Sequence, residues 1–135
     1  MDASAYGESA SSGDCLTGSN LSPGTGGIWS YTASGWPYTV TAVACNQRHL
    51  AEVFFAGNLW PASLATYPGD LTVSSMGDGQ CASVLNAYAG DSTAVLTYEF
   101  ITPGGSDWAS GDREVVCMAY EPGVWLRHSV KVTGR

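Results

Sequence analysis

The stretch that decides the fold class is residues 81–101, CASVLNAYAGDSTAVLTYEFI, because its hydrophobic period changes partway along. In its first part, four residues recur at the spacing i, i+3, i+4 and i+7: Cys81, Val84, Leu85 and Tyr88. This spacing predicts the apolar face of a short helix, with Asp78 as its candidate N-cap and Gly90 at its end. From residue 94 to residue 101 the apolar and polar side chains alternate, which predicts a half-buried strand.

Further strands are predicted on both sides of this stretch. Residues 38–45 are rich in Thr and Val, and a turn at 46–48 would pair them with a second strand at 51–55. Residues 114–120 are apolar on both faces and predict a central strand, and residues 124–132 alternate as a last strand. The sequence therefore predicts a small α+β domain, with a mainly antiparallel twisted sheet packed by one short helix.

The composition is typical of one β-rich exported domain. The chain has 135 residues, of which 44% are hydrophobic and 13% are charged. We expect residues 1–13 to form a flexible polar tail and residues 14–135 to form a single domain. Twelve acidic and five basic residues give a net charge of −7, which disfavours binding to nucleic acid or to an anionic membrane surface. No stretch predicts a membrane segment, and we expect the export segment to be absent from this chain.

The cysteines indicate an oxidising compartment. They are Cys15, Cys45, Cys81 and Cys117, and none has the CxxC spacing of a zinc or thioredoxin-type motif. Two disulfides are favoured over four free thiols, which implies an extracellular or extracytoplasmic location. Four cysteines allow three pairings. We favour Cys15–Cys45 and Cys81–Cys117, which would staple each half of the chain separately.

Two histidines are the candidates for catalysis. His49 stands three residues before Glu52, and a His with a Glu can perform general acid–base chemistry. On a strand these two side chains would point to opposite faces, so we favour a structural role in which His49 hydrogen-bonds the turn after Cys45. We expect His128 to be a buried imidazole in the last strand. The GxSxG and HExxH motifs are missing, and we predict no catalytic residue, no metal and no cofactor.

A second group with a predicted structural role stands ahead of the central strand. It consists of Trp108, Asp112 and Arg113 around a turn at Gly111. We expect Asp112 to accept backbone N–H bonds, Arg113 to pair with an acid, and Trp108 to pack across the turn. In the alternative interpretation the planar guanidinium of Arg113 binds a ligand carboxylate.

An aromatic cluster gives the candidate binding surface, and its members are Trp29, Tyr31, Trp36 and Tyr38. A turn at 33–35 would place them on a hairpin, and Pro37 favours an edge position. Such rings stack on sugars and dominate protein interfaces, although they also form cross-strand ladders on a core. We expect a protein partner or a glycan, with self-association through this hairpin as a further alternative.

An ordered set of short motifs resembles a known family. The patterns GDC (13–15), VxC (43–45) and HxAEV (49–53) are followed by YPG (67–69) and GDRxVxC (111–117). Together they resemble the septum-formation domain family of exported or membrane-anchored actinobacterial proteins. The resemblance implies a domain outside the membrane and supplies no catalytic residue. The chain departs from the family pattern in its aromatic hairpin and in a Gly/Ser-rich stretch with Met76 in place of a helix before Cys81.

These observations predict a non-enzymatic extracytoplasmic binding module at the cell envelope or in a secreted assembly. Two alternatives stay open. One is a secreted protease inhibitor that presents a loop at 16–27 or 102–110. The other is a hydrolase that uses His49 or His128.

Overall fold

The computed structural model describes residues 11–31, 39–90 and 94–131 of the chain. Within these ranges the fold is α+β, as predicted. The elements are, in chain order, β1 (Cys15–Ser19), β2 (Leu21–Pro23), β3 (Trp29–Tyr31), β4 (Thr39–Val43), β5 (Ala51–Asn58), α1 (Asp70–Ala89), β6 (Thr97–Ile101), α2 (Gly105–Ala109) and β7 (Glu114–Tyr120).

The main sheet is antiparallel and has the strand order β4-β1-β5-β7-β6. β7 lies between β5 and β6, which confirms the predicted central strand. The predicted pairing of the strands at 38–45 and 51–55 is wrong, because β1 lies between β4 and β5. Cys15 of β1 is in register with Val43 on one side and with Glu52 on the other.

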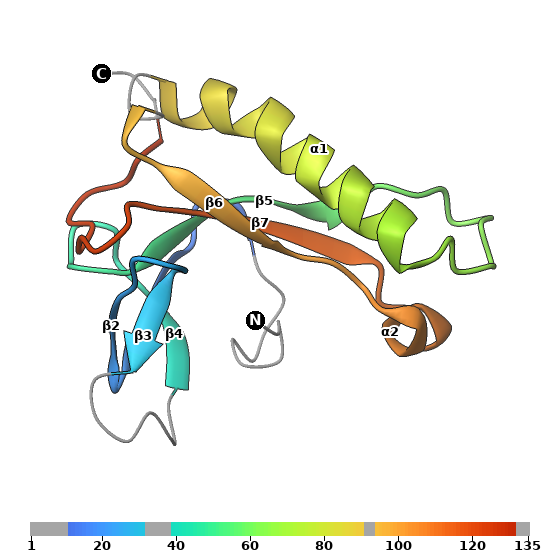
Figure 1. Cartoon of the computed structure of the whole chain (residues 1–135), viewed down its shortest axis with the longest axis horizontal. Coiled ribbons are helices and arrows are strands. Elements are labelled where there is room, and N and C mark those ends of the chain that lie inside the picture. Colours follow the sequence, from blue (N-terminus) through green and yellow to red (C-terminus); the bar gives the residue numbers. More distant parts are fainter. Residues whose placement is uncertain (1–10, 32–38, 91–93, 132–135) are drawn as a thin grey trace.

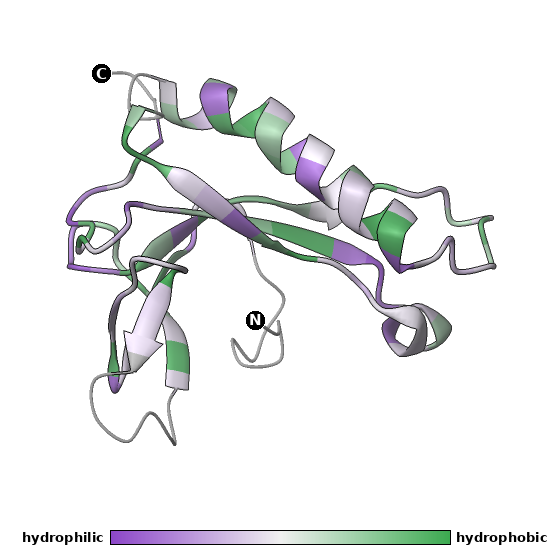
Figure 2. Ribbon diagram, in the orientation of Figure 1, coloured by the Kyte–Doolittle hydropathy of each residue, from purple (hydrophilic) through white to green (hydrophobic). Residues whose placement is uncertain are grey.

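One face of the main sheet is covered by α1 (Figure 1). The predicted stripe is buried at Cys81, Leu85 and Tyr88, and the helix ends at Gly90 as expected. On the sheet, the contacts come from alternate residues of β5 and β7, among them Phe54, Val115, Cys117 and Ala119. In Figure 2, hydrophobic and hydrophilic residues follow one another along α1.

α1 is much longer than the predicted helix, since it spans 20 residues and begins at Asp70. The Gly/Ser-rich stretch before Cys81 is therefore helical, and Asp78 lies inside the helix rather than at its N-cap. Val73 and Gly77 are buried in this half. Their packing against the sheet outweighs the weak helix propensity of the glycines and serines around them. Among the described residues, no helix has the length and apolar character needed to cross a membrane.

The opposite face of the sheet is partly covered by the hairpin of β2 and β3. Leu21, Ile28 and the half-buried Trp29 of this hairpin join a second hydrophobic cluster, to which the sheet contributes Ala51, Val53, Val116 and Met118. The backbone N–H of Ile28 donates to Glu99 Oε1 at 3.1 Å, which links the hairpin to the edge strand β6. β7 is therefore buried on both faces.

The segment after β7 is not the strand predicted at 124–132. Its described part makes one isolated antiparallel bridge, between Leu126 and His49. Leu126 and Val130 are buried in the helix-side core, whereas His128 is exposed, which contradicts its predicted burial. The alternating pattern was misleading because the residues that reach the core are four apart rather than two.

Two segments predicted as loops contain regular structure. Residues 16–27 hold most of β1 and all of β2, and residues 102–110 hold α2. The inhibitor hypothesis, which assigned a rigid loop to one of these segments, stays a prediction.

Candidate functional site

The four cysteines form two disulfides with the predicted pairing. Cys15–Cys45 joins the start of β1 to the loop after β4, with the Cα atoms 5.3 Å apart. Cys81–Cys117 joins α1 to the central strand β7, with the Cα atoms 5.6 Å apart. The second disulfide is fully buried between helix and sheet, whereas Cys45 of the first is partly exposed.

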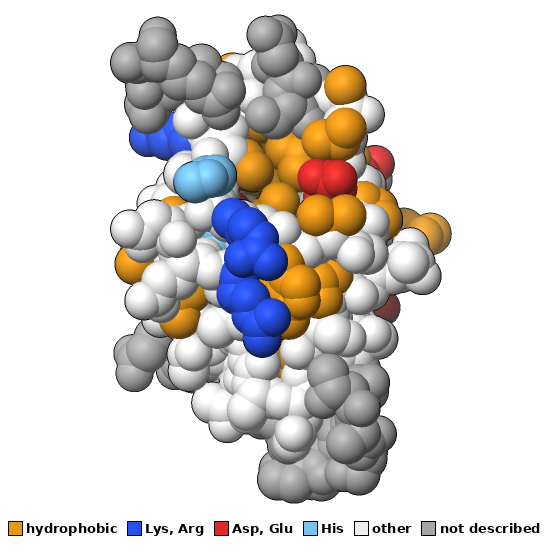
Figure 3. All heavy atoms as spheres, turned by 90° about the vertical axis from the view of Figure 1, so that its left-hand side faces the viewer, with side chains coloured by type: hydrophobic (Ala, Val, Ile, Leu, Met, Phe, Trp, Pro, Cys, Tyr) orange, Lys and Arg blue, Asp and Glu red, His pale blue; other side chains and the backbone are white. Residues whose placement is uncertain are grey.

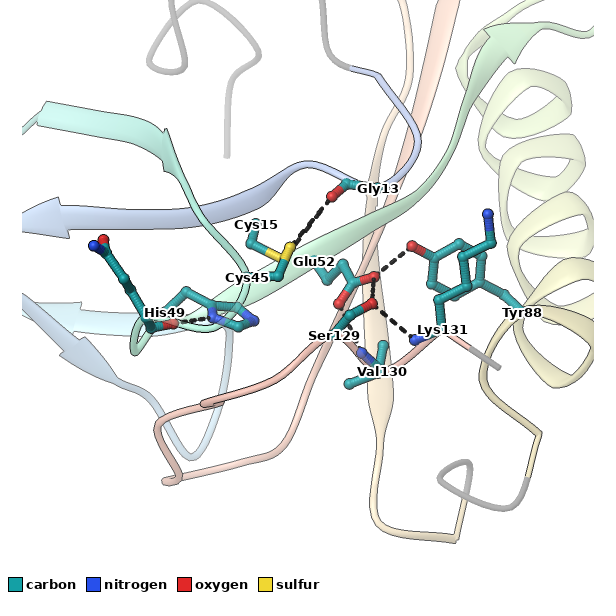
Figure 4. Close-up of a disulfide and its surroundings, with 10 residues drawn as sticks. Gly13, Cys15, Cys45, His49, Glu52, Tyr88, Ser129, Val130 and Lys131 are labelled. Atoms are coloured by element: carbon teal, nitrogen blue, oxygen red, sulfur yellow. Dashed lines mark hydrogen bonds between the residues drawn. A yellow bond between two sulfur atoms is a disulfide. The ribbon is translucent and has the colours of Figure 1, made fainter. Parts of the chain in front are cut away.

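A buried carboxylate beside the first disulfide forms the main polar site (Figure 4). Glu52 of β5 has an exposed fraction of 0%. The Tyr88 hydroxyl of α1 and Ser129 Oγ, at 2.9 Å, donate to its Oε2. The backbone N–H of Val130 donates to its Oε1 at 2.8 Å. We call these four residues the Glu52 cluster. Through this one carboxylate, the cluster links β5, α1 and the segment after β7.

The surroundings keep the donors of the Glu52 cluster in place. The backbone N–H of Lys131 donates to Ser129 Oγ at 3.1 Å, and the Lys131 ammonium lies 5.8 Å from the centre of the Tyr88 ring. Burial, and next the hydrogen bond to Glu52, raise the pKa of Tyr88 above its ordinary value of 10.0. The hydroxyl of Tyr88 therefore stays protonated at neutral pH and remains a donor.

The same carboxylate lies close to the first disulfide. Cys15 Sγ, Cys45 Sγ and a carboxylate oxygen of Glu52 are all within 4.8 Å of one another. Cysteine binds metals as a thiolate, and both sulfurs are joined in the disulfide. These three residues are therefore not a metal-binding set while the disulfide is intact.

His49 stabilises the turn after Cys45, as predicted. Its Nδ1 lies 2.7 Å from the Gln47 carbonyl oxygen, so Nδ1 carries the proton and donates it. Its backbone N–H and C=O both pair with Leu126. Within the described residues no hydrogen-bond partner reaches the buried Nε2. The three donors of Glu52 do not include His49, so the two residues do not form the hydrogen-bonded acid–base pair considered above.

The side chains of the group ahead of β7 contact other parts of the fold, and one expected contact is wrong. Trp108 is buried, and its Nε1–H donates to the Ala65 carbonyl at 3.1 Å. Asp112 accepts the backbone N–H two residues ahead at 3.1 Å, as predicted. Arg113 was expected to pair with an acid. In the described structure it donates instead to the Leu64 carbonyl, and its guanidinium carbon lies 4.1 Å from the centre of the Trp108 ring.

The aromatic cluster is only partly described. Trp29 is half-buried against the second hydrophobic cluster. The strand that contains it pairs with β2, where Tyr31 is in register with Leu21. Trp36, Tyr38 and the predicted turn at 33–35 lie outside the described residues. The binding surface proposed for this cluster therefore stays a prediction.

The sequence pattern identifies Glu52 but not its partners. Tyr88 is counted there as an apolar member of the helix stripe. Its hydroxyl is the available signal, because a tyrosine on a buried helix face needs a polar partner in the core. Ser129 gives no comparable signal, since serine is mostly found at solvent-exposed positions.

A family model described as Septum formation matches residues 25–134 of the chain. No curated protein and no solved structure matches it. The match confirms the resemblance drawn from the ordered motifs, while an actinobacterial origin stays a prediction. Since the matched range covers well over half of the 135 residues, the chain belongs to the septum-formation family.

Proposed function

We propose that this domain is a non-enzymatic interaction module that acts in septum formation on the outer side of the membrane. The family match supports the septal role. The two disulfides support the location, because such bonds persist in oxidising compartments.

The main observation behind this proposal is that the reactive side chains make their contacts within the fold. Glu52 accepts bonds from three donors that all belong to the fold itself. Asp112 and Arg113 bind backbone groups of neighbouring loops. His49 is fully buried against its own turn. Because these groups hold the structure together, the domain acts through its surface rather than by chemistry at a reactive centre.

The partner is a protein or a glycan of the cell envelope, and the aromatic segment at 29–38 is one candidate contact. Aromatic side chains supply much of the binding energy of interfaces. Alanine at both Trp29 and Trp36 should abolish binding to such a partner, provided that the variant keeps the unfolding midpoint of the parent domain. Capture of a second copy of the domain instead would assign the segment to self-association.

A complementation experiment tests the proposed function. In cells that lack their own copy, the protein is supplied either with an export signal or confined to the cytoplasm. We expect normal septa only with the exported form, and enrichment of that form at septa. Equal rescue by the cytoplasmic form would overturn the proposed location, and absence of any septal defect in the deletion strain would overturn the role.

The hydrolase alternative is tested in the same cells. Gln in place of His49 or of His128 removes an imidazole that a hydrolase would need. We expect each variant that folds to restore septation fully. Loss of rescue by a folded variant that still reaches the septum would contradict the non-enzymatic role.

A further inference from the structure

Two arginines meet across the isolated bridge between the turn before β5 and the segment after β7. His49 and Leu126 exchange both backbone hydrogen bonds at 2.8 Å. In an antiparallel pair of this kind, the residue before one member stands opposite the residue after the other. Arg48 and Arg127 are therefore cross-strand neighbours, and both are exposed.

Trp125 completes the group on the same side of this bridge. The guanidinium carbon of Arg48 lies 4.1 Å from the centre of the Trp125 ring, a stacked cation–π arrangement. Trp125 is half-buried and packs against the second hydrophobic cluster, so the ring is a fixed support for the guanidinium. We call Arg48, Trp125 and Arg127 the arginine–tryptophan patch. In Figure 3 a run of Lys and Arg side chains lies beside hydrophobic ones on this end of the molecule.

The charges of this patch are not neutralised by the described part of the protein. No carboxylate of the described residues forms an ion pair with Arg48 or Arg127. Like charges that face each other across a strand pair are destabilising. The chain has five basic and twelve acidic residues, yet two of the five stand here side by side. An anion that bridges the two guanidinium groups would relieve this repulsion.

We propose that the arginine–tryptophan patch binds an acidic peptide segment of a partner protein. The inference rests on the proposed function, because it names the partner chemistry of an interaction module. Each planar guanidinium matches a carboxylate with two parallel hydrogen bonds. The exposed part of the Trp125 ring offers an apolar contact to a side chain next to that carboxylate.

The net charge favours a short acidic segment over an extended anionic surface. A membrane or a long phosphate polymer would bring its negative charge against the rest of a domain that carries −7. Charges are screened beyond about 8 Å at physiological ionic strength, so a short peptide meets mainly the two arginines. Its bidentate contacts also distinguish it from a diffuse counterion layer.

Binding of a defined probe tests the proposal. The probe is a fluorescent peptide in which Glu residues flank a single Leu, and its control has Gln in place of every Glu. We expect the Glu peptide alone to bind, to shift the indole N–H resonance of Trp125, and to bind more weakly as salt is added. The double variant R48Q/R127Q should weaken binding by about tenfold or more. The variant R48K/R127K, which keeps the charge and loses the planar fork, should fall between the two.

Several outcomes would overturn the proposal. These are equal binding of both peptides, no binding of the Glu peptide, and unchanged binding in R48Q/R127Q. Stronger retention of the domain on phosphatidylglycerol vesicles than on the Glu peptide would assign the patch to a membrane instead. The variant K131Q is the control, because it removes a positive charge outside the patch, and its binding should match that of the parent domain.

The septation assay separates this proposal from the proposed function. If exported R48Q/R127Q restores septation and septal enrichment fully, the patch proposal fails while the interaction module stands. If the exported parent domain itself does nothing at the septum, the proposed function fails whatever the peptide result.

Discussion

At the scale of single residues, Glu52 is a fully buried acidic side chain that accepts three hydrogen bonds within the fold. Replacing it with Gln keeps its shape but turns one acceptor oxygen into an NH2 group that faces a donor. We expect Glu52→Gln to lower the free energy of unfolding by about 2–4 kcal/mol, because a buried, charge-assisted network is broken. Urea unfolding measures the change.

Tyr88→Phe is the matched control for that variant. It removes one of the three donors and leaves the carboxylate with the other two. The expected loss is smaller, about 1–2 kcal/mol. An unfolding midpoint of Glu52→Gln equal to that of the parent domain would show that the Glu52 cluster contributes nothing to stability.

Tyr88 also gives a pH prediction. Burial first, and then the bond to Glu52, raise its pKa above 10.0, and the pKa values of Tyr67, Tyr98 and Tyr120 are raised as well. A group whose pKa is higher in the folded state stabilises fully below its unfolded pKa and loses that contribution as pH rises. Stability should therefore fall from about pH 10 upward, and less steeply in Tyr88→Phe. Urea unfolding below and above pH 10 checks this, and identical slopes would contradict it.

The residues of the Glu52 cluster show how far sequence reasoning reaches at this scale. His49 and Glu52 stand out because their chemistry is visible in a single stretch. The partners of Glu52 are 36, 77 and 78 residues away along the chain. No local pattern encodes such distances, so the site could be predicted as a residue but not as a network.

At the scale of elements, the two halves of α1 form for different reasons, one visible in the local sequence and one that depends on tertiary packing. Its second half could be predicted from the stripe at Cys81, Leu85 and Tyr88. Its first half contains Gly77 and Gly79 and shows little helix propensity of its own. That half is helical because its buried side packs against β5, β6 and β7, which a window of sequence does not contain.

The two glycines of α1 provide a matched pair of variants. A methyl group at Gly77 would lie 2.7 Å from Thr102 Cγ2 and 3.2 Å from Phe100, whereas one at Gly79 meets nothing within 4 Å. We expect Gly77→Ala to destabilise by about 1–3 kcal/mol through overpacking. Gly79→Ala should stabilise by about 0.5–1 kcal/mol, because alanine favours the helix. Thermal unfolding of both variants measures this, and a stabilising Gly77→Ala would refute the close packing of α1 on β6.

The strand order shows the limit of local pairing rules. The turn at 46–48 suggests a hairpin, but β4 and β5 are separated by β1. The cysteine pairing carried the better information, because Cys15–Cys45 requires β1 to lie beside the end of β4. β6 and β7 could be predicted from the sequence, because β6 alternates between apolar and polar residues and β7 is apolar on both faces, as expected of a central strand.

At the scale of the whole molecule, the two disulfides join different parts of the fold. Cys81–Cys117 connects α1 to β7 inside the helix-side core. Cys15–Cys45 connects the start of β1, inside the sheet, to the loop after β4, next to the Glu52 carboxylate. Each closes a loop that, on the chain-entropy model, stabilises the fold by about 3–4 kcal/mol. The fold therefore depends on both bonds, but the two bonds differ in their access to solvent.

This difference predicts the order in which the two disulfides are reduced. A reductant attacks a sulfur that it can reach, and Cys45 is partly exposed while Cys81 and Cys117 are fully buried. In native conditions, rising dithiothreitol should therefore open Cys15–Cys45 first, and Cys81–Cys117 should open only as the domain unfolds. Alkylation followed by peptide mass mapping reads out each pair, and near-ultraviolet circular dichroism follows the core. Simultaneous labelling of all four cysteines would mean that reduction proceeds only through global unfolding, so that Cys15–Cys45 protects the whole fold as much as Cys81–Cys117 does.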